Sequence, residues 1–181
     1  MAKRVSETKT EFLVSERARQ KGTALLANVD FMGKAIKCAQ GASEDLPIGC
    51  VIVKDGTIIG RGCNKKEELQ DATLHAEMVA IQEASKKLGE WRLDGCKMYV
   101  TLEPCPMCMW AILNARIDEL YFGAYDYNYG AAGSKLNLVP LLGSKIKITG
   151  GIKEKECEEI LKNYFAGLRH GSRRLRAVEA K

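Results

Sequence analysis

Four residues in two short motifs have the types and spacing of a metal site. Cys105 and Cys108 lie three residues apart in EPCPMC, and His75 lies about thirty residues earlier, two residues before Glu77. Residues three apart share one face of a helix, so both cysteines can bind one ion. One histidine and two thiolates suit zinc, and three protein ligands leave the fourth tetrahedral position open, which is typical of catalytic zinc. Glu77 then remains available to carry protons.

Taken by itself, EPCPMC also permits other chemistry. A C-P-x-C sequence at a helix start suits a thioredoxin-like redox pair, but that interpretation leaves His75 and Glu77 unexplained. A closed structural zinc site needs a fourth ligand, for which Cys63 and Cys96 are the candidates, although neither belongs to a paired motif. The two motifs together favour the open zinc site over both alternatives.

The elements that must position these motifs alternate in type. The pattern predicts, in order, a helix over 29–41, a hairpin over 48–62, a helix over 74–89, a strand over 97–102, a helix over 104–115, strands over 119–123 and 145–149, and a helix over 153–168. Asp55-Gly56 is the hairpin turn, Asp71 and Thr73 are the candidate caps of the second helix, and Gly89 ends it. Pro104 is expected at the first position of the third helix. This order predicts an α/β fold, a three-layer α/β/α sandwich with a mixed sheet.

The topology also predicts where the four residues meet. His75 and Glu77 fall in the first turn of the second helix, and Cys105 and Cys108 in the first turn of the third. Each of these helices follows a strand, so both helix starts are expected at the carboxyl edge of the sheet, where ligand crevices form. The positive end of each helix dipole also favours the thiolate that a metal requires.

Length and composition exclude several classes of protein. The chain has 181 residues, the size of one domain, and no apolar run approaches the roughly 18 residues of a membrane helix. The charged N-terminus lacks the apolar stretch of a signal peptide, so we expect a cytoplasmic protein with no membrane partner. The seven cysteines are an odd number and fit free thiols in a reducing compartment better than disulfides.

The basic charge is concentrated at the two ends of the chain. Residues 1–28 carry six Lys and Arg against three acidic residues, and residues 162–181 carry six against one, whereas residues 29–161 have a net charge of −3. We therefore expect an N-terminal extension over 1–28, flexible or briefly helical, a compact domain over 29–168 and a basic C-terminal tail over 169–181. Such a tail either meets a polyanion such as RNA or simply remains solvated.

The two motifs resemble a known signature. HAE at 75–77 with PCPMC at 104–108 is similar to the H-x-E…P-C-x-x-C pattern of zinc-dependent nucleobase deaminases. The segments DLPIGCVIVKDGTIIGRGCN, YVTLEPCPMC, FGAYDYNYGAAGS and GGIKEKECEEILKNYF extend the likeness. Over roughly residues 30–168 the chain resembles the bacterial tRNA-specific adenosine deaminases of the cytidine/deoxycytidylate deaminase superfamily.

The resemblance implies a specific site and activity. The family has a five-stranded sheet, binds one Zn²⁺ per chain, forms homodimers and converts the wobble adenosine of a tRNA anticodon stem-loop to inosine by hydrolysis. Transferred to this sequence, the metal ligands are His75, Cys105 and Cys108, and the catalytic residue is Glu77. The implied substrate-binding residues are Asn64 and the Ala76 backbone at the base, Asp126 at a neighbouring ribose hydroxyl, and Phe165.

Plain alternatives exist for three of these residues, and the chain departs from the family pattern in places. Asn64 could cap a loop, Asp126 could be a turn residue and Phe165 could be a core residue. The departures are Asn128, the Met109-Trp110 pair and a shortened segment before residue 145. They concern RNA contacts and the dimer face rather than the zinc ligands.

Three functions remain open on the sequence. The first is deamination of a tRNA adenosine. The second is deamination of a free base or nucleoside of the guanine or cytosine type, or of single-stranded DNA. The third is a redox or structural-zinc protein that binds RNA through its basic ends.

Overall fold

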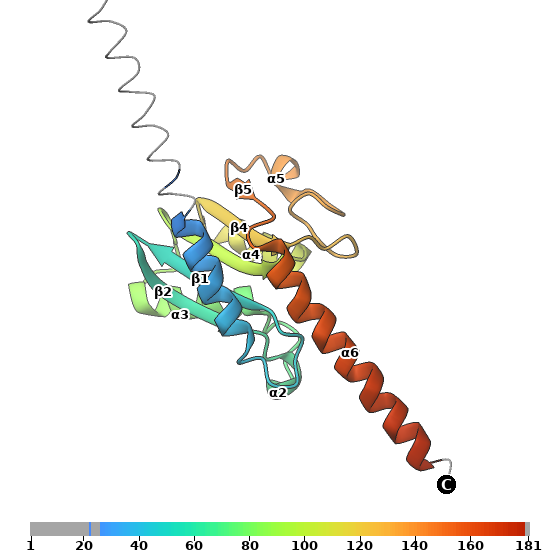
Figure 1. The fold of residues 1–181 in the computed structure, drawn as a ribbon. Coiled ribbons are helices and arrows are strands. Elements are labelled where there is room, and N and C mark those ends of the chain that lie inside the picture. The colour runs from blue at the N-terminus through green and yellow to red at the C-terminus, as the bar shows by residue number, and fades with distance from the viewer. Residues whose placement is uncertain (1–21, 23–25, 180–181) are drawn as a thin grey trace, which may run out of the picture.

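A five-stranded mixed sheet forms the centre of the molecule (Figure 1). The computed structural model describes residue 22 and residues 26–179, with side chains up to residue 169, so most of the predicted extension over 1–28 lies outside the described residues. The strands, in the order β2-β1-β3-β4-β5, are β1 (Gly49–Lys54), β2 (Thr57–Cys63), β3 (Lys97–Leu102), β4 (Glu119–Ala124) and β5 (Lys147–Thr149). β1 is antiparallel to β2 and β3, while β3, β4 and β5 are parallel.

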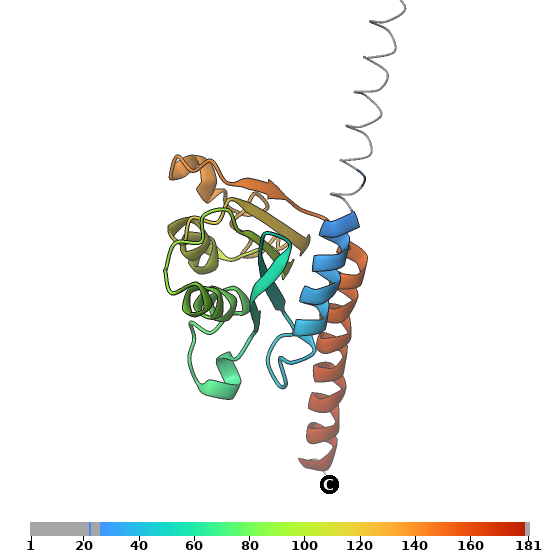
Figure 2. The same ribbon diagram turned by 90° about the vertical axis from the view of Figure 1, so that its left-hand side faces the viewer.

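Helices cover both faces of this sheet (Figure 2). The helices are the one over residues 26–39, α2 (Lys66–Leu69), α3 (Ala76–Leu88), α4 (Pro106–Asn114), α5 (Leu138–Leu141) and α6 (Glu154–Glu179). One hydrophobic cluster joins α3 and α4 to the sheet, and a second joins the helix over 26–39 and α6 to the opposite face. The predicted three-layer α/β/α sandwich is confirmed.

The N-terminal ends of two helices differ from the prediction. His75 and Cys105 are the N-cap residues of α3 and α4, not first-turn residues, and Pro106 rather than Pro104 occupies the first turn of α4. Asp71 does not cap α3, because its carboxyl group accepts the N–H and the hydroxyl of Thr73 within its own turn. Both motifs therefore lie where a loop becomes a helix, and there the first backbone N–H groups have no intrahelical partner.

Turn chemistry and helix ends account for the other outcomes. The hairpin turn at Asp55 and Gly56 is confirmed, with φ angles of 49° and 73°, and Gly89 ends α3 as predicted. The helices α2 and α5 were not predicted, because four residues are too few to establish a helical period. The closing helix was predicted to end at 168, but α6 continues through Glu179, so the segment proposed as a tail is helical over 169–179.

A close backbone contact sets α3 on the sheet. A Cβ atom added to Gly62 in β2 would lie 2.0 Å from the carbonyl oxygen of Ala76, the first residue of α3. No side chain fits there, so glycine lets the helix start rest directly on the strand. The position of His75, one residue before Ala76, is thereby tied to the sheet.

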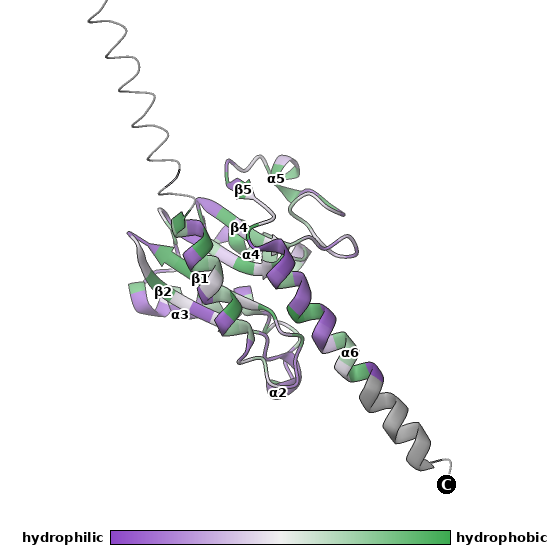
Figure 3. Ribbon diagram, in the orientation of Figure 1, coloured by the Kyte–Doolittle hydropathy of each residue, from purple (hydrophilic) through white to green (hydrophobic). Residues whose placement is uncertain are grey.

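Hydropathy differs between the outer elements of the fold. Figure 3 shows hydrophilic residues around α2 and alternating hydrophilic and hydrophobic stretches along the described part of α6. Within the described residues, none of the helices combines the length and apolarity needed to cross a membrane.

Candidate active site and metal centre

The two helix starts that carry the motifs meet at one edge of the sheet. β2 and β3 are both antiparallel to β1, so they run in the same direction and end on the same side. α3 follows β2 and α4 follows β3 along the chain. His75, Cys105 and Cys108 converge there, with one ligand atom from each within 4.8 Å of the others.

The donor atoms have the spacing of a zinc site. His75 Nδ1 lies 3.7 Å from Cys105 Sγ and 3.5 Å from Cys108 Sγ. Zinc–sulfur bonds of about 2.3 Å and zinc–nitrogen bonds of about 2.0 Å at a tetrahedral angle place such atoms about 3.6 Å apart. The residues present therefore fit a single zinc ion, and three protein ligands leave one coordination position open.

The pKa values of the two cysteine thiols are shifted in opposite directions. A hydrogen bond with Cys108, together with one to His75, lowers the pKa of Cys105 to about 4. The same thiol pair and burial raise the pKa of Cys108, and the hydrogen bond with Cys105 raises the pKa of His75. The lowered pKa of Cys105 favours its thiolate, which is the form that a metal requires.

Glu77 lies beside this group and is buried, with 4% of its surface exposed. Burial raises the pKa of its carboxyl group to about 7. A carboxyl group that gains and loses a proton near neutral pH is suited to general acid and base catalysis.

A cavity of about 470 Å³ opens onto these residues. It is bordered by groups from the helix starts, the loop before β1, the loop after β4, and α6: Asp45, Leu46, Ile48, Asn64, Lys66, Glu67, His75, Glu77, Leu102, Glu103, Cys105, Pro106, Asp126, Tyr129, Tyr164, Phe165 and Leu168. Three of the four predicted substrate-binding residues, Asn64, Asp126 and Phe165, are among them. The fourth, Ala76, does not border the cavity.

Asn64 and Ala76 are joined by a hydrogen bond. Asn64 is 6% exposed, and its side-chain oxygen accepts the backbone N–H of Ala76 at 2.9 Å. Asn64 therefore caps α3 from a distance, while its amide nitrogen remains available at the cavity. The N–H of Ala76 is already used, and its carbonyl oxygen faces Gly62.

Asp126 and Phe165 border the cavity from two different elements, the loop after β4 and α6. Asp126 is half-buried and accepts the N–H groups of Asn128 and Tyr129 in its own turn, at 2.9 and 3.0 Å. Phe165 is 47% exposed on α6, so it is not a core residue. Its neighbour Tyr164 donates a hydrogen bond to the Glu44 carbonyl at 3.0 Å, which fixes α6 to the loop before β1.

Two buried acidic residues of the cavity were not predicted. Asp45 is 3% exposed and accepts the N–H groups of Glu67 and Glu68 at the start of α2. Glu103 is 2% exposed and is the first residue of EPCPMC. Its place within that motif was a usable signal for Glu103, whereas nothing in the local sequence marks Asp45.

The alternative metal and redox sites gain no support. Among the described residues, the only group of three or more possible metal ligands is His75, Cys105 and Cys108, so neither Cys63 nor Cys96 completes a closed site. All seven cysteines are free thiols. The third ligand, His75, distinguishes this site from a two-cysteine redox pair.

The fold and the site are those of a zinc-dependent deaminase. The family model described as the cytidine and deoxycytidylate deaminase zinc-binding region matches residues 27–124, which contain all four motif residues. The tRNA-specific adenosine deaminase of Bacillus subtilis is 43% identical over 143 residues, which are 77% of this chain and 89% of that protein. The tRNA-specific adenosine deaminase of Aquifex aeolicus is 41% identical over 144 residues, 77% of this chain and 95% of that protein.

A solved structure supports the same assignment. One from a study of A-to-I editing by tRNA:A34 deaminases at the wobble position of transfer RNA is 42% identical, with a TM-score of 0.68, over 73% of this chain and 99% of that chain. The chain belongs to the family of tRNA-specific adenosine deaminases within the cytidine and deoxycytidylate deaminases. Its cofactor is accordingly zinc, which the donor set fits.

Proposed function

We propose that the protein hydrolyses adenosine to inosine, with release of ammonia, at the wobble position of a tRNA anticodon. The observation that supports this best is the convergence of three zinc-type ligands and a buried carboxyl group at one cavity. That site lies in a chain 43% identical to a tRNA-specific adenosine deaminase.

His75, Cys105 and Cys108 would hold the metal. What zinc supplies when bound is Lewis acidity, which lowers the pKa of a coordinated water to about 7. Glu77 would take a proton from the water and deliver protons first to the ring nitrogen beside the reacting carbon and then to the departing ammonia. Its pKa of about 7 allows both directions of transfer at neutral pH.

The cavity favours a base that has left its stack. Glu77 is buried, so a base paired within a duplex does not reach it, whereas a base of a single-stranded loop can be turned into the cavity. Asn64 would hydrogen-bond the base through its amide nitrogen. Tyr129 and Phe165, 71% and 47% exposed at the rim, offer aromatic faces to neighbouring bases.

We propose that α6 also contacts the RNA backbone. The helix passes the cavity at Phe165 and continues through Glu179 (Figure 1), and the sequence over 162–181 carries six basic residues against one acidic residue. Phosphate contacts from such a segment would make RNA affinity fall with salt. A chain that ends at residue 168 should keep its activity on a short stem-loop at low salt but lose affinity for whole tRNA.

The decisive experiment is incubation of the zinc-loaded protein with total tRNA, followed by sequencing for adenosine-to-inosine changes. Inosine confined to anticodon position 34 is the expected result, and Glu77→Ala should abolish it. A zinc-loaded protein that leaves every such adenosine unmodified contradicts the proposal.

A second candidate function uses the same site. The guanine deaminase of Bacillus subtilis is 38% identical with a TM-score of 0.52, over 63% of this chain and 73% of that chain. A panel of free guanine, free cytidine and single-stranded DNA, assayed beside the tRNA, separates these possibilities. Turnover of a free base without turnover of RNA would replace the first proposal with this one.

We also propose that the protein is a cytoplasmic homodimer. Met109 of α4 is fully buried, but its neighbour Trp110 is 51% exposed. Trp110 and Trp91 line a groove of about 990 Å³ that contains none of the metal ligands and suits a protein partner better than the reaction. Light scattering should give a dimer that Trp110→Lys converts to a monomer. The tRNA substrate and the seven free thiols support the cytoplasmic location.

A further inference from the structure

One buried carboxyl group at the cavity has no part in the reaction proposed above. The side chain of Glu103 accepts three backbone N–H groups: Asp126 N–H at Oε2, 3.2 Å away, and the Ala132 and Ser134 N–H groups at Oε1, each 3.0 Å away. All three donors belong to residues 125–134 after β4, here named the Asp126 loop. Glu103 therefore fastens this loop at both ends from within the protein.

The surroundings of Glu103 allow its carboxyl group one position. A Cβ atom added to Gly130, in the middle of the loop, would lie 2.5 Å from Glu103 Oε2 and 2.4 Å from the Asp126 carbonyl oxygen. The main chain adds two bonds, from Glu103 N–H to Ala124 at 2.9 Å and from Ala131 N–H to Pro104 at 2.8 Å. The loop and the segment leading to Cys105 are thus joined as one unit.

Asp126 is the functional residue that this unit places. Glu103 holds its backbone N–H, and its own Oδ1 accepts the N–H groups of Asn128 and Tyr129. Within the part of the chain that is described, its Oδ2 makes no hydrogen bond, and its side chain borders the cavity. A carboxyl oxygen fixed in this way selects a ligand that presents a hydroxyl group at one point.

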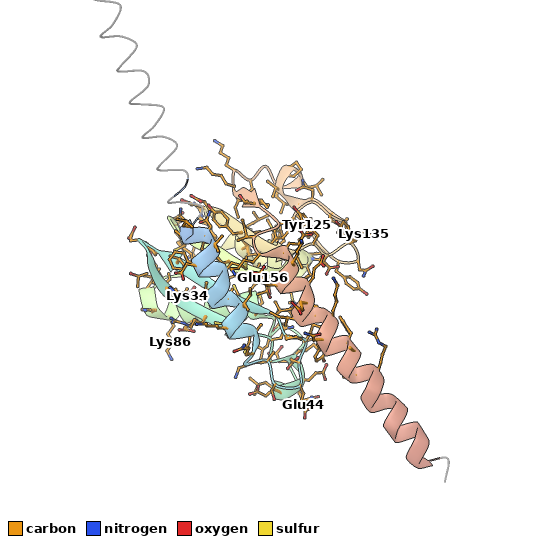
Figure 4. All side chains as sticks on the ribbon, in the orientation of Figure 1. Lys34, Glu44, Lys86, Tyr125, Lys135 and Glu156 are labelled. Carbon is orange, nitrogen blue, oxygen red and sulfur yellow. The ribbon has the colours of Figure 1, made fainter. Side chains whose placement is uncertain are left out.

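The Asp126 loop borders the cavity together with α6. Figure 4 labels Tyr125, the first residue of this loop, and Lys135, which directly follows it. Tyr129 of the same loop borders the cavity and is largely exposed. A shift of the loop would therefore move the residues that meet a nucleotide next to the target base.

We infer that Glu103 is a positioning residue that sets the preference for a ribose over a deoxyribose beside the target base. It acts by fixing the Asp126 loop to the segment that carries the cysteine ligands. A displaced Glu103 would leave three partly buried N–H groups without acceptors, so the loop has one favoured position. This inference rests on the proposed function.

The test compares an all-ribose anticodon stem-loop with two others, each of which lacks one 2′-hydroxyl. In one the nucleotide before the target adenosine is deoxy, and in the other the nucleotide after it is deoxy. The wild type should prefer the ribose form by about tenfold in kcat/KM, the range for a hydrogen bond to a charged group. Glu103→Gln keeps the shape of the side chain but replaces one carboxylate oxygen with an NH₂ group. That group is a donor, and it would face a backbone N–H group of the loop. In this variant the preference for ribose should fall at least about threefold, because KM for the ribose substrate rises. The zinc content should stay unchanged.

Two variants separate positioning from general stability. Glu83→Gln is the matched control, because Glu83 also accepts a backbone N–H, from Arg61 at 3.0 Å, but at the exposed edge strand. It should leave the preference unchanged. Asp126→Asn should lower the preference directly, and adding Glu103→Gln to it should lower the preference no further, since both act through one contact.

A second variant tests the inference if Glu103→Gln fails to fold. Gly130→Ala leaves the carboxyl group intact but displaces it, and it should lower the ribose preference in the same way. Three results for Glu103→Gln would each overturn the inference. The first is an unchanged ribose preference with lower stability, the second is an effect on the preference that adds to that of Asp126→Asn, and the third is loss of zinc. A wild type that deaminates all three stem-loops equally also overturns it, whereas a wild type that deaminates none of them overturns the proposed function.

Discussion

The floor and the rim of the cavity are built in opposite ways. At the floor, Cys108 and Glu77 are buried, and the start of α3 rests on the backbone of β2 at Gly62. At the rim, Tyr129 and Phe165 are 71% and 47% exposed and come from the loop after β4 and from α6. The floor is therefore built into the packed interior, whereas the exposed aromatic side chains of the rim can change without unfolding the protein.

The largest expected effect is at the floor. Glu77→Gln removes the only proposed proton carrier while keeping its shape, so kcat for stem-loop deamination should fall by about 10³. Single-turnover measurement of inosine, with zinc content checked by metal analysis, tests this. A decrease in kcat smaller than about tenfold in the zinc-loaded variant would show that Glu77 is not the proton carrier. Glu83→Gln, an exposed carboxyl group, should have no effect.

The same residue should make the metal-free protein sensitive to pH. Burial raises the pKa of Glu77 from 4.5 to about 7, so the folded state binds its proton more tightly than the unfolded state. Stability should then decrease as pH rises from about 4.5 to about 7. After zinc removal, Glu77→Gln should be about 3 kcal/mol more stable than the wild type above pH 7 and equally stable below pH 4.5. Urea unfolding of both proteins across this pH range measures the difference in their free energies of unfolding. A difference that does not change with pH would show that burying the ionised Glu77 carboxylate has no such cost.

Gly62→Ala tests how the floor is held. The added Cβ would meet the Ala76 carbonyl oxygen at 2.0 Å, so the start of α3 must move, at a cost of about 2 kcal/mol. Zinc affinity should fall together with the melting temperature, because His75 precedes that helix start. The matched control is Gly33→Ala in the helix over 26–39, where an added Cβ meets nothing within 4 Å. It should be neutral or stabilising.

The smallest effect is expected at the rim. Phe165→Ala should raise KM for the stem-loop about fivefold, roughly 1 kcal/mol, and leave kcat and the melting temperature nearly unchanged. Steady-state kinetics beside a thermal melt test this. A drop of several degrees without a change in KM would make Phe165 a packing residue and weaken the contrast between floor and rim.

Local signals predicted the fold and the floor well. Alternating helix and strand patterns gave the layered sandwich, and the spacing of His75, Cys105 and Cys108 gave the metal group that the structure brings together. The predicted N-terminal ends of α3 and α4 were wrong, because His75 and Cys105 are themselves the N-cap residues of helices that were expected to start earlier. A proline at each of positions 104 and 106 gave the sequence two possible starts for one helix.

Contacts between distant parts of the chain were not predictable from the pattern. Glu103 bonds residues 23 to 31 positions further on, and Asp45 bonds residues 22 and 23 positions further on. No periodicity relates such residues, and buried acidic residues look like surface residues in the sequence. The roles of Asn64, Asp126 and Phe165 stay predictions, now with positions at the cavity.

The bond between Asn64 and Ala76 limits how this enzyme can evolve. A mutation that changed Asn64 to alter base recognition would also leave the Ala76 N–H buried without an acceptor, at a cost of about 1–3 kcal/mol. That loss would fall at the start of the helix that presents Glu77. New substrates are therefore more accessible to the lineage through exposed side chains such as Tyr129 in the loop after β4 and Phe165 in α6, where a substitution does not also expose a buried N–H group at the start of a catalytic helix.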